Sequence, residues 1–404
     1  LNDASGNQWA LVITDEINVL SLGAIGNNSQ DNLLPFNAAI AGGSRAVFVP
    51  AGTYNLSATW LFNDNNVTVR FAGQGVCTIV PTFATTNIVQ IGASGLTKNI
   101  HFRGGFTIDA PSGIPRTANA GIGLFDAQQC SIESCELNNM FYGMYIDGPN
   151  TTHVVFNDMV IRNVAPTTGI GVFIDGGGDH FFNNLSIING EFLQGMAGIR
   201  IRQSNATWID NSDILHSGIG LLVNPGDGHV VGWLFINNTA FDLNTLDGVR
   251  IKSSVGTNVI NKGHQFTACW TSSNGIAGVR ISGDDIPDGV HFADHRAVNN
   301  GGNGYLVEKG VNITFDACKA GGNSQTALNT SAGIQINADV QKFAVRNCSS
   351  GNLYRYGVTQ GRGLTINAGT SDDYIVTCND FTGNTLGPSD GGTGVNKIFT
   401  NNIS

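Results

Sequence analysis

The chain has 404 residues, of which 54 are Gly and 46 are Asn, and only 12% are charged. Because Gly and Asn tolerate left-handed backbone conformations, this composition predicts frequent tight turns and excludes long helices. The 41% of hydrophobic residues exclude a disordered chain, and no apolar run is long enough to span a membrane. A net charge of −10 argues against a nucleic-acid partner, and the even composition predicts one large all-β unit.

The N-terminal part contains the best helix candidate of the chain. Residues 31–41 read D-N-L-L-P-F-N-A-A-I-A, and residues 46–56, A-V-F-V-P-A-G-T-Y-N-L, read as the first strands. We therefore divide the chain into a lead-in with a helical cap, residues 1–45, and a β region, residues 46–404. The sequence begins at Leu1 without a basic and apolar leader, so we expect no signal peptide in this chain.

A four-residue phrase recurs through the β region: Gly, an apolar residue, any residue and a second apolar residue. It begins at Gly143, Gly171, Gly198, Gly220, Gly248, Gly278, Gly304, Gly333 and Gly363, at intervals of 22 to 30 residues. Each phrase is followed by a second alternating strand, a turn rich in Asn and a third short apolar stretch. A leucine-rich repeat would need a Leu-x-x-Leu-x-Leu signature and a helix in each repeat, and neither is present.

Three short strands per repeat predict one coil of a parallel β-helix. A single coil cannot bury its inward side chains, whereas stacked coils share one continuous core. We expect about 10–12 coils, with equivalent residues of neighbouring coils aligned in ladders, including Asn ladders at the second turn. The helix at 31–41 would cover the open end of the stack.

The opening of the chain carries a more specific resemblance. Residues 17–32, I-N-V-L-S-L-G-A-I-G-N-N-S-Q-D-N, followed by F-V-P-A-G-T-Y at 48–54, resemble the start of the pectate-lyase-like right-handed β-helices, above all bacteriophage tailspikes and other polysaccharide depolymerases. The usual acidic G-D-G-x-x-D-D is replaced here by G-N-N-S-Q-D-N at 26–32. The resemblance implies a single-stranded right-handed parallel β-helix that acts on a polysaccharide, assembles as a homotrimer and is located in a virion tail or outside the cell.

Seven Cys residues occur without any C-x-x-C pair, which gives no support to a zinc or thioredoxin-type site. Cys318, Cys348 and Cys378 are each 30 residues apart. This spacing predicts an interior ladder of reduced, buried thiols rather than disulfide chemistry.

In β-helices of this kind, as the resemblance implies, substrates lie along the sheet formed by the recurring phrase. Strand alternation turns two residues of each phrase outward, and we call the resulting set the outward stripe. Five of the 20 Lys and Arg residues fall within it. Its predicted members are Tyr145/Asp147, Phe173/Asp175, Arg200/Arg202, Leu222/Asn224, Arg250/Lys252, Arg280/Ser282, Leu306/Glu308 and Gln335/Asn337.

The chemistry of the stripe favours a groove for an acidic polysaccharide. Aromatic rings stack against the C–H faces of sugars, and guanidinium groups bind carboxylates. A solvated face and a trimer interface remain the structural alternatives.

We expect Asp147 and Asp175 to lie about 5 Å apart, one coil from each other, which is near the separation in retaining glycosidases. Elimination would instead use the cations to neutralise a uronate, with Lys252 or an Arg as base. Hydrolysis is slightly favoured.

A second resemblance lies at residues 247–252. Asp247-Gly248-Val249-Arg250-Ile251-Lys252 is similar to the Arg-Ile-Lys strand of polygalacturonases. The catalytic Asp pair and His of that family do not carry over, because Met196-Ala197 and Ile219 stand in their places. We therefore expect contacts to a substrate carboxylate here and infer no polygalacturonase activity.

These observations define the candidate site. Catalytic candidates are Asp147, Asp175, Asp247 and Lys252, and substrate-binding candidates are Tyr145, Phe173, Arg200, Arg202, Arg250, Arg280 and Glu191, the last from a loop expected to overhang the Arg200 coil. We expect no metal or other cofactor, because the eight His residues share no ligand spacing and two carboxylates make a poor Ca²⁺ cage.

The sequence thus favours a depolymerase of a bacterial surface polysaccharide, capsular or O-antigen, with no nucleic-acid or membrane partner. Two alternatives stay open. One is a secreted uronan lyase or epimerase, and the other is a non-catalytic carbohydrate-binding adhesin on the same fold.

Overall fold

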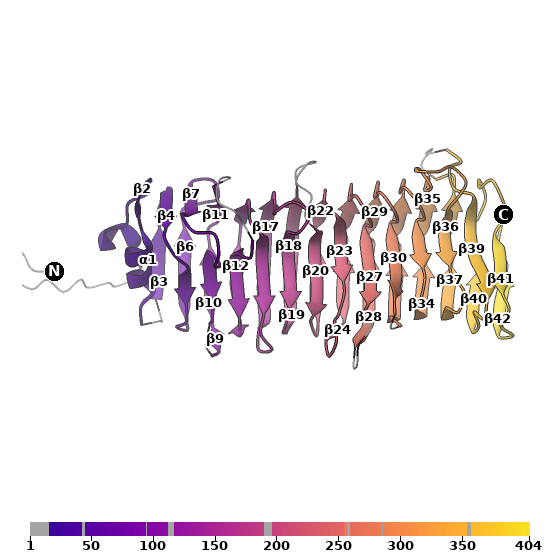
Figure 1. Cartoon of the computed structure of the whole chain (residues 1–404), viewed down its shortest axis with the longest axis horizontal. Coiled ribbons are helices and arrows are strands. Elements are labelled where there is room, and N and C mark those ends of the chain that lie inside the picture. The colour runs from indigo at the N-terminus through magenta and orange to yellow at the C-terminus, as the bar shows by residue number, and fades with distance from the viewer. Residues whose placement is uncertain are drawn as a thin grey trace, which may run out of the picture.

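The computed structural model describes residues 16–42, 45–93, 95–111, 117–189, 196–254, 256, 259–284, 286–353 and 357–404. Its strands wind into a right-handed parallel β-helix whose coils stack along the long axis of the molecule (Figure 1). One sheet has 13 strands, one from each of about 13 turns, slightly more than the 10–12 coils expected. The all-β fold predicted from the repeats is confirmed.

The nine copies of the recurring phrase all lie in this 13-stranded sheet, as predicted. Its strands are, in chain order, β5 (Trp60–Phe62), β8 (Val89–Ile91), β12 (Ala120–Phe125), β16 (Tyr142–Asp147), β18 (Ile170–Asp175), β20 (Ala197–Gln203), β23 (Ile219–Val223), β27 (Val249–Ser253), β30 (Val279–Gly283), β33 (Tyr305–Val307), β36 (Ala332–Ile336), β39 (Arg362–Gly369) and β41 (Ser389–Gly392).

The second and third strands of the coils join in a 29-stranded sheet that completes the wall of the β-helix. Its strands are β1 (Ile17–Asn18), β2 (Asn27–Asp31), β3 (Arg45–Val49), β4 (Gly52–Leu56), β6 (Val67–Phe71), β7 (Cys77–Pro81), β9 (Thr97–Lys98), β10 (Ile100–Arg103), β11 (Phe106–Asp109), β13 (Ala127–Gln128), β14 (Ser131–Glu133), β15 (Cys135–Asn138), β17 (Thr152–Arg162), β19 (Gly178–Ile188), β21 (Thr207–Asp210), β22 (Asp213–Leu215), β24 (Val230–Gly232), β25 (Leu234–Asn237), β26 (Ala240–Asp242), β28 (Ile260–Thr267), β29 (Trp270–Ser272), β31 (Asp288–Ala293), β32 (Arg296–Val298), β34 (Val311–Asp316), β35 (Lys319–Gly321), β37 (Gln341–Arg346), β38 (Ser349–Gly351), β40 (Tyr374–Thr377) and β42 (Lys397–Thr400).

The predicted helical cap is present at the N-terminal end of the stack. Helix α1 (Leu33–Ile40) follows a 3₁₀ turn, η1 (Val19–Leu22), and covers the first coils (Figure 1). Phe36 of the helix packs against Tyr54 and Trp60, with ring centroids 5.3 and 4.7 Å away. The helix therefore closes the apolar interior at this end. No helix among the described residues has the length and apolar character needed to cross a membrane.

Close contact between coils explains the Gly that opens each phrase. A Cβ atom built on Gly143 would lie 2.5 Å from the carbonyl oxygen of Gly171, and one built on Gly171 would lie 2.5 Å from that of Gly198. The same clash recurs at Gly220 against Gly248 and at Gly304 against Gly333. The position is thus restricted to Gly by the approach of the next coil, which is why the phrase recurs along the chain.

The second turn of each coil depends on one left-handed residue. Asn184, Asn211 and Asn238 occupy this position in successive coils, with φ angles of 57°, 52° and 45°. Their side chains also connect the coils, because Asn238 Nδ2 donates to Asn211 Oδ1 at 2.9 Å and Asn184 Nδ2 donates to Asp158 Oδ1 at 2.7 Å. The predicted Asn ladder at this turn is confirmed.

A second Asn ladder, which the sequence analysis missed, lies inside the turn that precedes the 13-stranded sheet. Asn244, Asn274, Asn300 and Asn323 are each about 1% exposed or less. The Oδ1 atom of each accepts from the backbone N–H of the preceding member, at 3.1 Å in all three steps. The ladder thus gives hydrogen-bond acceptors to backbone N–H groups in a buried turn, where water cannot supply them.

The predicted Cys ladder is confirmed at Cys318 and Cys348, which are 1% exposed, but it is wrong at Cys378, which is exposed. The coil between Cys348 and Cys378 is one residue longer than the Cys spacing, since Ser349 aligns with Asp380. Buried Asn379 therefore follows Cys348 in the ladder, and Cys378 takes the left-handed position of the turn, with φ 58°.

This difference predicts selective thiol labelling. Cys378 should react rapidly with iodoacetamide in the native protein, whereas Cys318 and Cys348 should react only after denaturation. Burial also raises the pKa of Cys318, which lowers its thiolate fraction. Mass spectrometry of peptides alkylated before and after denaturation measures both. Rapid native labelling of Cys318 or Cys348, or a disulfide between them, would contradict the interior ladder.

Candidate functional site

Strand register aligns the outward stripe as expected, except at Asp175, where a register shift places this residue opposite Gln203 rather than Arg202. Tyr145 of β16 lies opposite Phe173 of β18, and Phe173 lies opposite Arg200 of β20. Further along the sheet, Arg250 of β27 lies opposite Arg280 of β30. The alternation places the intervening apolar residues in the core, so the polar members of the stripe share one face of the sheet.

The upstream part of the stripe forms a compact group, which we call the upstream cluster: Tyr142, Tyr145, Asp147, Phe173, Asp175, Arg200 and Arg202. The rings of Tyr145 and Phe173 stack with centroids 5.3 Å apart and an interplanar angle of 14°. Tyr142 lies 5.6 Å from Tyr145 and 5.5 Å from Phe173. Sequence reasoning missed Tyr142 because it lies just before its phrase, although the adjacent aromatic pair Phe141-Tyr142 was a readable signal.

The two carboxylates of the cluster have different environments. Asp147 accepts hydrogen bonds from the Tyr145 hydroxyl at 2.8 Å and from the backbone N–H of Gly148 at 2.6 Å. Asp175 is almost fully buried, with 4% of its side chain exposed, and forms a bidentate ion pair with Arg202. Burial and the hydrogen bond to Asp147 raise the pKa of Tyr145, so its proton stays on the phenol at neutral pH.

The two arginines of the cluster also differ. Arg202 is bound by Asp175, whose hydrogen bonds raise the pKa of the guanidinium. Arg200 has no carboxylate partner among the described residues. Its guanidinium lies over Phe173, 5.3 Å from the ring centroid, and 3.9 Å from the sulfur of Met196. Burial, and then repulsion from Arg202, lower its pKa. Arg200 is thus a partly buried cation whose charge nothing in the described structure neutralises.

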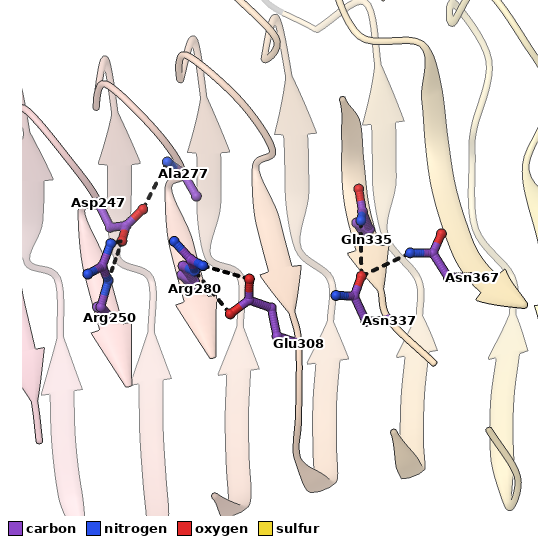
Figure 2. Close-up of polar contacts among 8 residues, drawn as sticks. All are labelled: Asp247, Arg250, Ala277, Arg280, Glu308, Gln335, Asn337 and Asn367. Atoms are coloured by element: carbon purple, nitrogen blue, oxygen red, sulfur yellow. Dashed lines mark hydrogen bonds and ion pairs between the residues drawn. The ribbon is translucent and has the colours of Figure 1, made fainter. Parts of the chain in front are cut away.

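The downstream cations of the stripe are mostly committed to intramolecular ion pairs (Figure 2). Arg250 pairs with Asp247, whose side chain is fully buried and whose Oδ1 also accepts from the backbone N–H of Ala277 at 3.1 Å. Arg280 forms a bidentate pair with Glu308, at 3.1 and 2.7 Å. Burial raises the pKa of Asp247, and Arg250 opposes that shift. Lys252 is exposed and has no ion-pair partner among the residues that the structure describes.

Two further observations complete the candidate set. Glu191 lies outside the described residues, so its predicted reach into the groove stays a prediction. The described residues contain no group of three or more His, Cys, Asp or Glu side chains arranged to hold a metal ion.

The chain matches no protein-family model and no curated protein sequence. Solved structures do share its fold. The A-module of the mannuronan C-5 epimerase AlgE6 of Azotobacter vinelandii aligns with a TM-score of 0.63 at 17% identity, covering 96% of this chain and 98% of that module. Gene product 12 of bacteriophage phi29, in its pre-mature form, gives 0.54 at 13% identity, over 94% of this chain and 55% of its own.

The adhesin PfbA of Streptococcus pneumoniae gives a TM-score of 0.50 at 13% identity, over 96% of this chain and 90% of its own. At such low identities the likeness establishes the fold alone. The family of β-helices that the opening of the chain resembles has the same architecture.

Proposed function

We propose that the chain cleaves an acidic polysaccharide of a bacterial surface, bound along the 13-stranded sheet with the upstream cluster at its reacting centre. Arg200 is the observation that carries this proposal. A guanidinium that is partly buried and lacks an acidic partner is costly, unless a ligand supplies the negative charge. A sugar carboxylate would do so, while Tyr142, Tyr145 and Phe173 offer aromatic surface to the ring beside it.

The two downstream arginines of the stripe differ from Arg200 because they already have acidic partners, and this difference supports the same assignment. Arg250 and Arg280 already hold Asp247 and Glu308, so a substrate carboxylate would have to displace those partners. Within the described part of the chain, Arg200 and Lys252 have no acidic partner that a substrate carboxylate would have to displace. We therefore assign recognition of the acidic sugar to Arg200, with Lys252 further along the groove.

In the hydrolytic form of the proposal, Asp147 and Asp175 are the two carboxylates that flank the scissile bond. Arg202 holds Asp175 in a bidentate ion pair, which fixes this carboxylate in place as a nucleophile or a stabiliser of positive charge. Asp147 is the more exposed of the two and would exchange the proton with the leaving oxygen.

A second candidate reaction is β-elimination, favoured by the hydrogen bond between Tyr145 and Asp147. Arg200 would neutralise the uronate, Asp147 would remove the C5 proton, and the Tyr145 hydroxyl would protonate the oxygen released from C4. The mannuronan epimerase provides a uronan-active example on the same fold, which makes a uronan substrate compatible with this architecture.

Incubation with a panel of acidic capsular and O-antigen polysaccharides, followed by mass spectrometry, tests the proposal. Arg200→Gln should lower kcat/KM about 100-fold or more, and Asp147→Asn should lower kcat by a similar factor. Arg103→Gln, which removes a charge from the exposed face of β10 on the other sheet, is the matched control and should leave activity unchanged.

The products decide between the two reactions, because elimination leaves an unsaturated uronate that absorbs in the ultraviolet and hydrolysis does not. Full activity of Asp147→Asn would remove this carboxylate from the mechanism. Binding without fragments across the panel would favour an adhesin.

A further inference from the structure

A cavity of about 870 Å³ opens beside the downstream end of the stripe. Its walls come from four successive coils: the turns that follow β30, β33 and β36, the first residues of β31, β34 and β37, and the end of β39. The turn after β33 has only three residues, 308–310, whereas the turns after β30 and β36 have four each, 284–287 and 337–340. The short turn leaves a hollow between its longer neighbours.

The amide side chains of Asn337, Gln341 and Asn367 line this cavity, and Gln335 lies next to them outside the lining. Figure 2 shows Gln335, Asn337 and Asn367 side by side on the last coils, and Asn337 Oδ1 accepts from both of the others at 3.0 Å. The Nδ2 group of Asn337 donates to no described residue, although the side chain lines the cavity. A donor is therefore available to a ligand at this side.

Apolar side chains form another part of the cavity lining. Val311, Ala338 and Ala368 line the cavity, and the side chain of Ile286, which is 60% exposed, stands at its rim. A cavity of this volume with an apolar surface and a few polar groups is typical of sites for small organic ligands.

Negative charge dominates the remaining lining. Asp284, Asp288 and Asp339 line the cavity with Lys309 as the one cation among the described lining residues, while Glu308 is neutralised by Arg280. Asp288 uses Oδ1 to accept from Asn312, and Asp339 uses Oδ1 to accept from Thr370. The Oδ2 atoms of both carry no described hydrogen bond and can accept from hydroxyl groups, whereas an anionic ligand would be repelled.

We infer that this cavity is a saccharide-binding site distinct from the upstream cluster, and that it takes an uncharged sugar unit. Hydroxyl groups of the sugar would donate to the carboxylates and accept from Asn337, and its C–H face would cover Val311, Ala338 and Ala368. The two sites thus have opposite charge preferences, which suits a heteropolymer that alternates acidic and neutral sugars. The binding site itself does not depend on cleavage at the upstream cluster.

Saturation-transfer NMR and calorimetry with D-glucose, D-galactose, N-acetyl-D-glucosamine and D-glucuronate test the inference without measuring turnover. At least one of the three neutral sugars should bind with a Kd of about 1 mM or tighter, and glucuronate should bind at least about tenfold more weakly. Failure of all three neutral sugars, or equal binding of glucuronate, would overturn it.

Two variants locate the binding. Ala368→Trp fills the cavity from an exposed position, and Asn337→Ala removes the available donor, so each should weaken binding of the neutral sugar by about tenfold or more. Arg200→Gln is the matched control and should bind the sugar normally, because it changes only the upstream cluster. Unchanged binding in both cavity variants, with melting temperatures close to that of the parent, would place the sugar elsewhere.

Discussion

Lowering the pH from 7 to 5 should remove about 6 kcal/mol from the free energy of unfolding. His180, His264 and His295 are completely buried, and burial lowers the pKa of His180 to about 4 and that of His264 and His295 to about 3, from 6.5. A lowered pKa means that the folded state keeps the neutral ring while the unfolded state takes up a proton. The stabilisation is therefore complete above pH 6.5 and is lost as the pH falls below it, by about 2 kcal/mol per His at pH 5.

The hydrogen bonds of these rings give the physical reason. His180 Nε2 contacts the carbonyl oxygen of Gly176, His264 Nε2 contacts Asn261 Oδ1, and His295 Nδ1 contacts the Tyr305 hydroxyl. The second ring nitrogen of each His has no hydrogen-bond partner in the part of the chain that the structure describes. A proton added there would create a buried charge with no acceptor, which the fold cannot accommodate.

Urea unfolding at a series of pH values between 8 and 5 measures the effect. The slope should approach about 4 kcal/mol per pH unit below pH 6, which corresponds to three protons. His264→Leu should reduce that slope by one proton, whatever its cost at neutral pH. His153→Asn, at an exposed left-handed position, is the control and should keep the slope of the parent. A stability that is flat between pH 7 and 5 would contradict the assignment.

Asn274→Ala should destabilise the protein by about 4 kcal/mol, because it interrupts the buried Asn ladder. Asn274 Oδ1 accepts from the backbone N and from Nδ2 of Asn244, at 3.1 and 3.0 Å. Its Nδ2 donates to the carbonyl oxygen of Phe241 at 3.1 Å and to Asn300 Oδ1 at 3.0 Å. The substitution leaves several of these groups without partners in a dry turn, and each costs about 1–3 kcal/mol.

An exposed Asn at the end of β25, next to the ladder of the second turn, provides the comparison. Asn237 donates to Asp210 Oδ1 at 2.7 Å in a position open to water. Asn237→Ala should therefore cost less than about 0.5 kcal/mol. Equal costs for the two variants, measured by urea unfolding at pH 7.5, would show that the buried ladder has no special role.

The fold was predictable from the sequence because its main constraint repeats. Gly143 and Gly171 are required for the same reason, the close approach of the backbone of the next coil. The phrase that they open therefore recurs from coil to coil and reveals the length of the repeat. Cys378 shows the limit of that approach. A one-residue change in coil length moves a side chain from the interior to the left-handed position of a turn, and counting residues does not reveal where the extra residue lies.

The candidate site was only partly predictable, for a different physical reason. Strand alternation places Arg200 and Arg202 on the same face, but it does not reveal that Asp175 binds Arg202 and that Arg200 has no acidic partner among the described residues. Which of the two arginines pairs with Asp175 depends on side-chain geometry across neighbouring coils. The cavity beside β33 was equally hidden, since it depends on the relative lengths of three neighbouring turns rather than on any residue type.

Coil length varies from 22 to 30 residues between successive phrases, while the strands stay in parallel register. The variation is confined to the turns, because the ladders fix the interior. Adding or deleting turn residues can therefore raise or lower the rim of the sheet at one coil without moving the side chains of the next. Such an architecture separates change at the rim from the maintenance of stability: related chains can differ by insertions or deletions at the rim and keep the same interior.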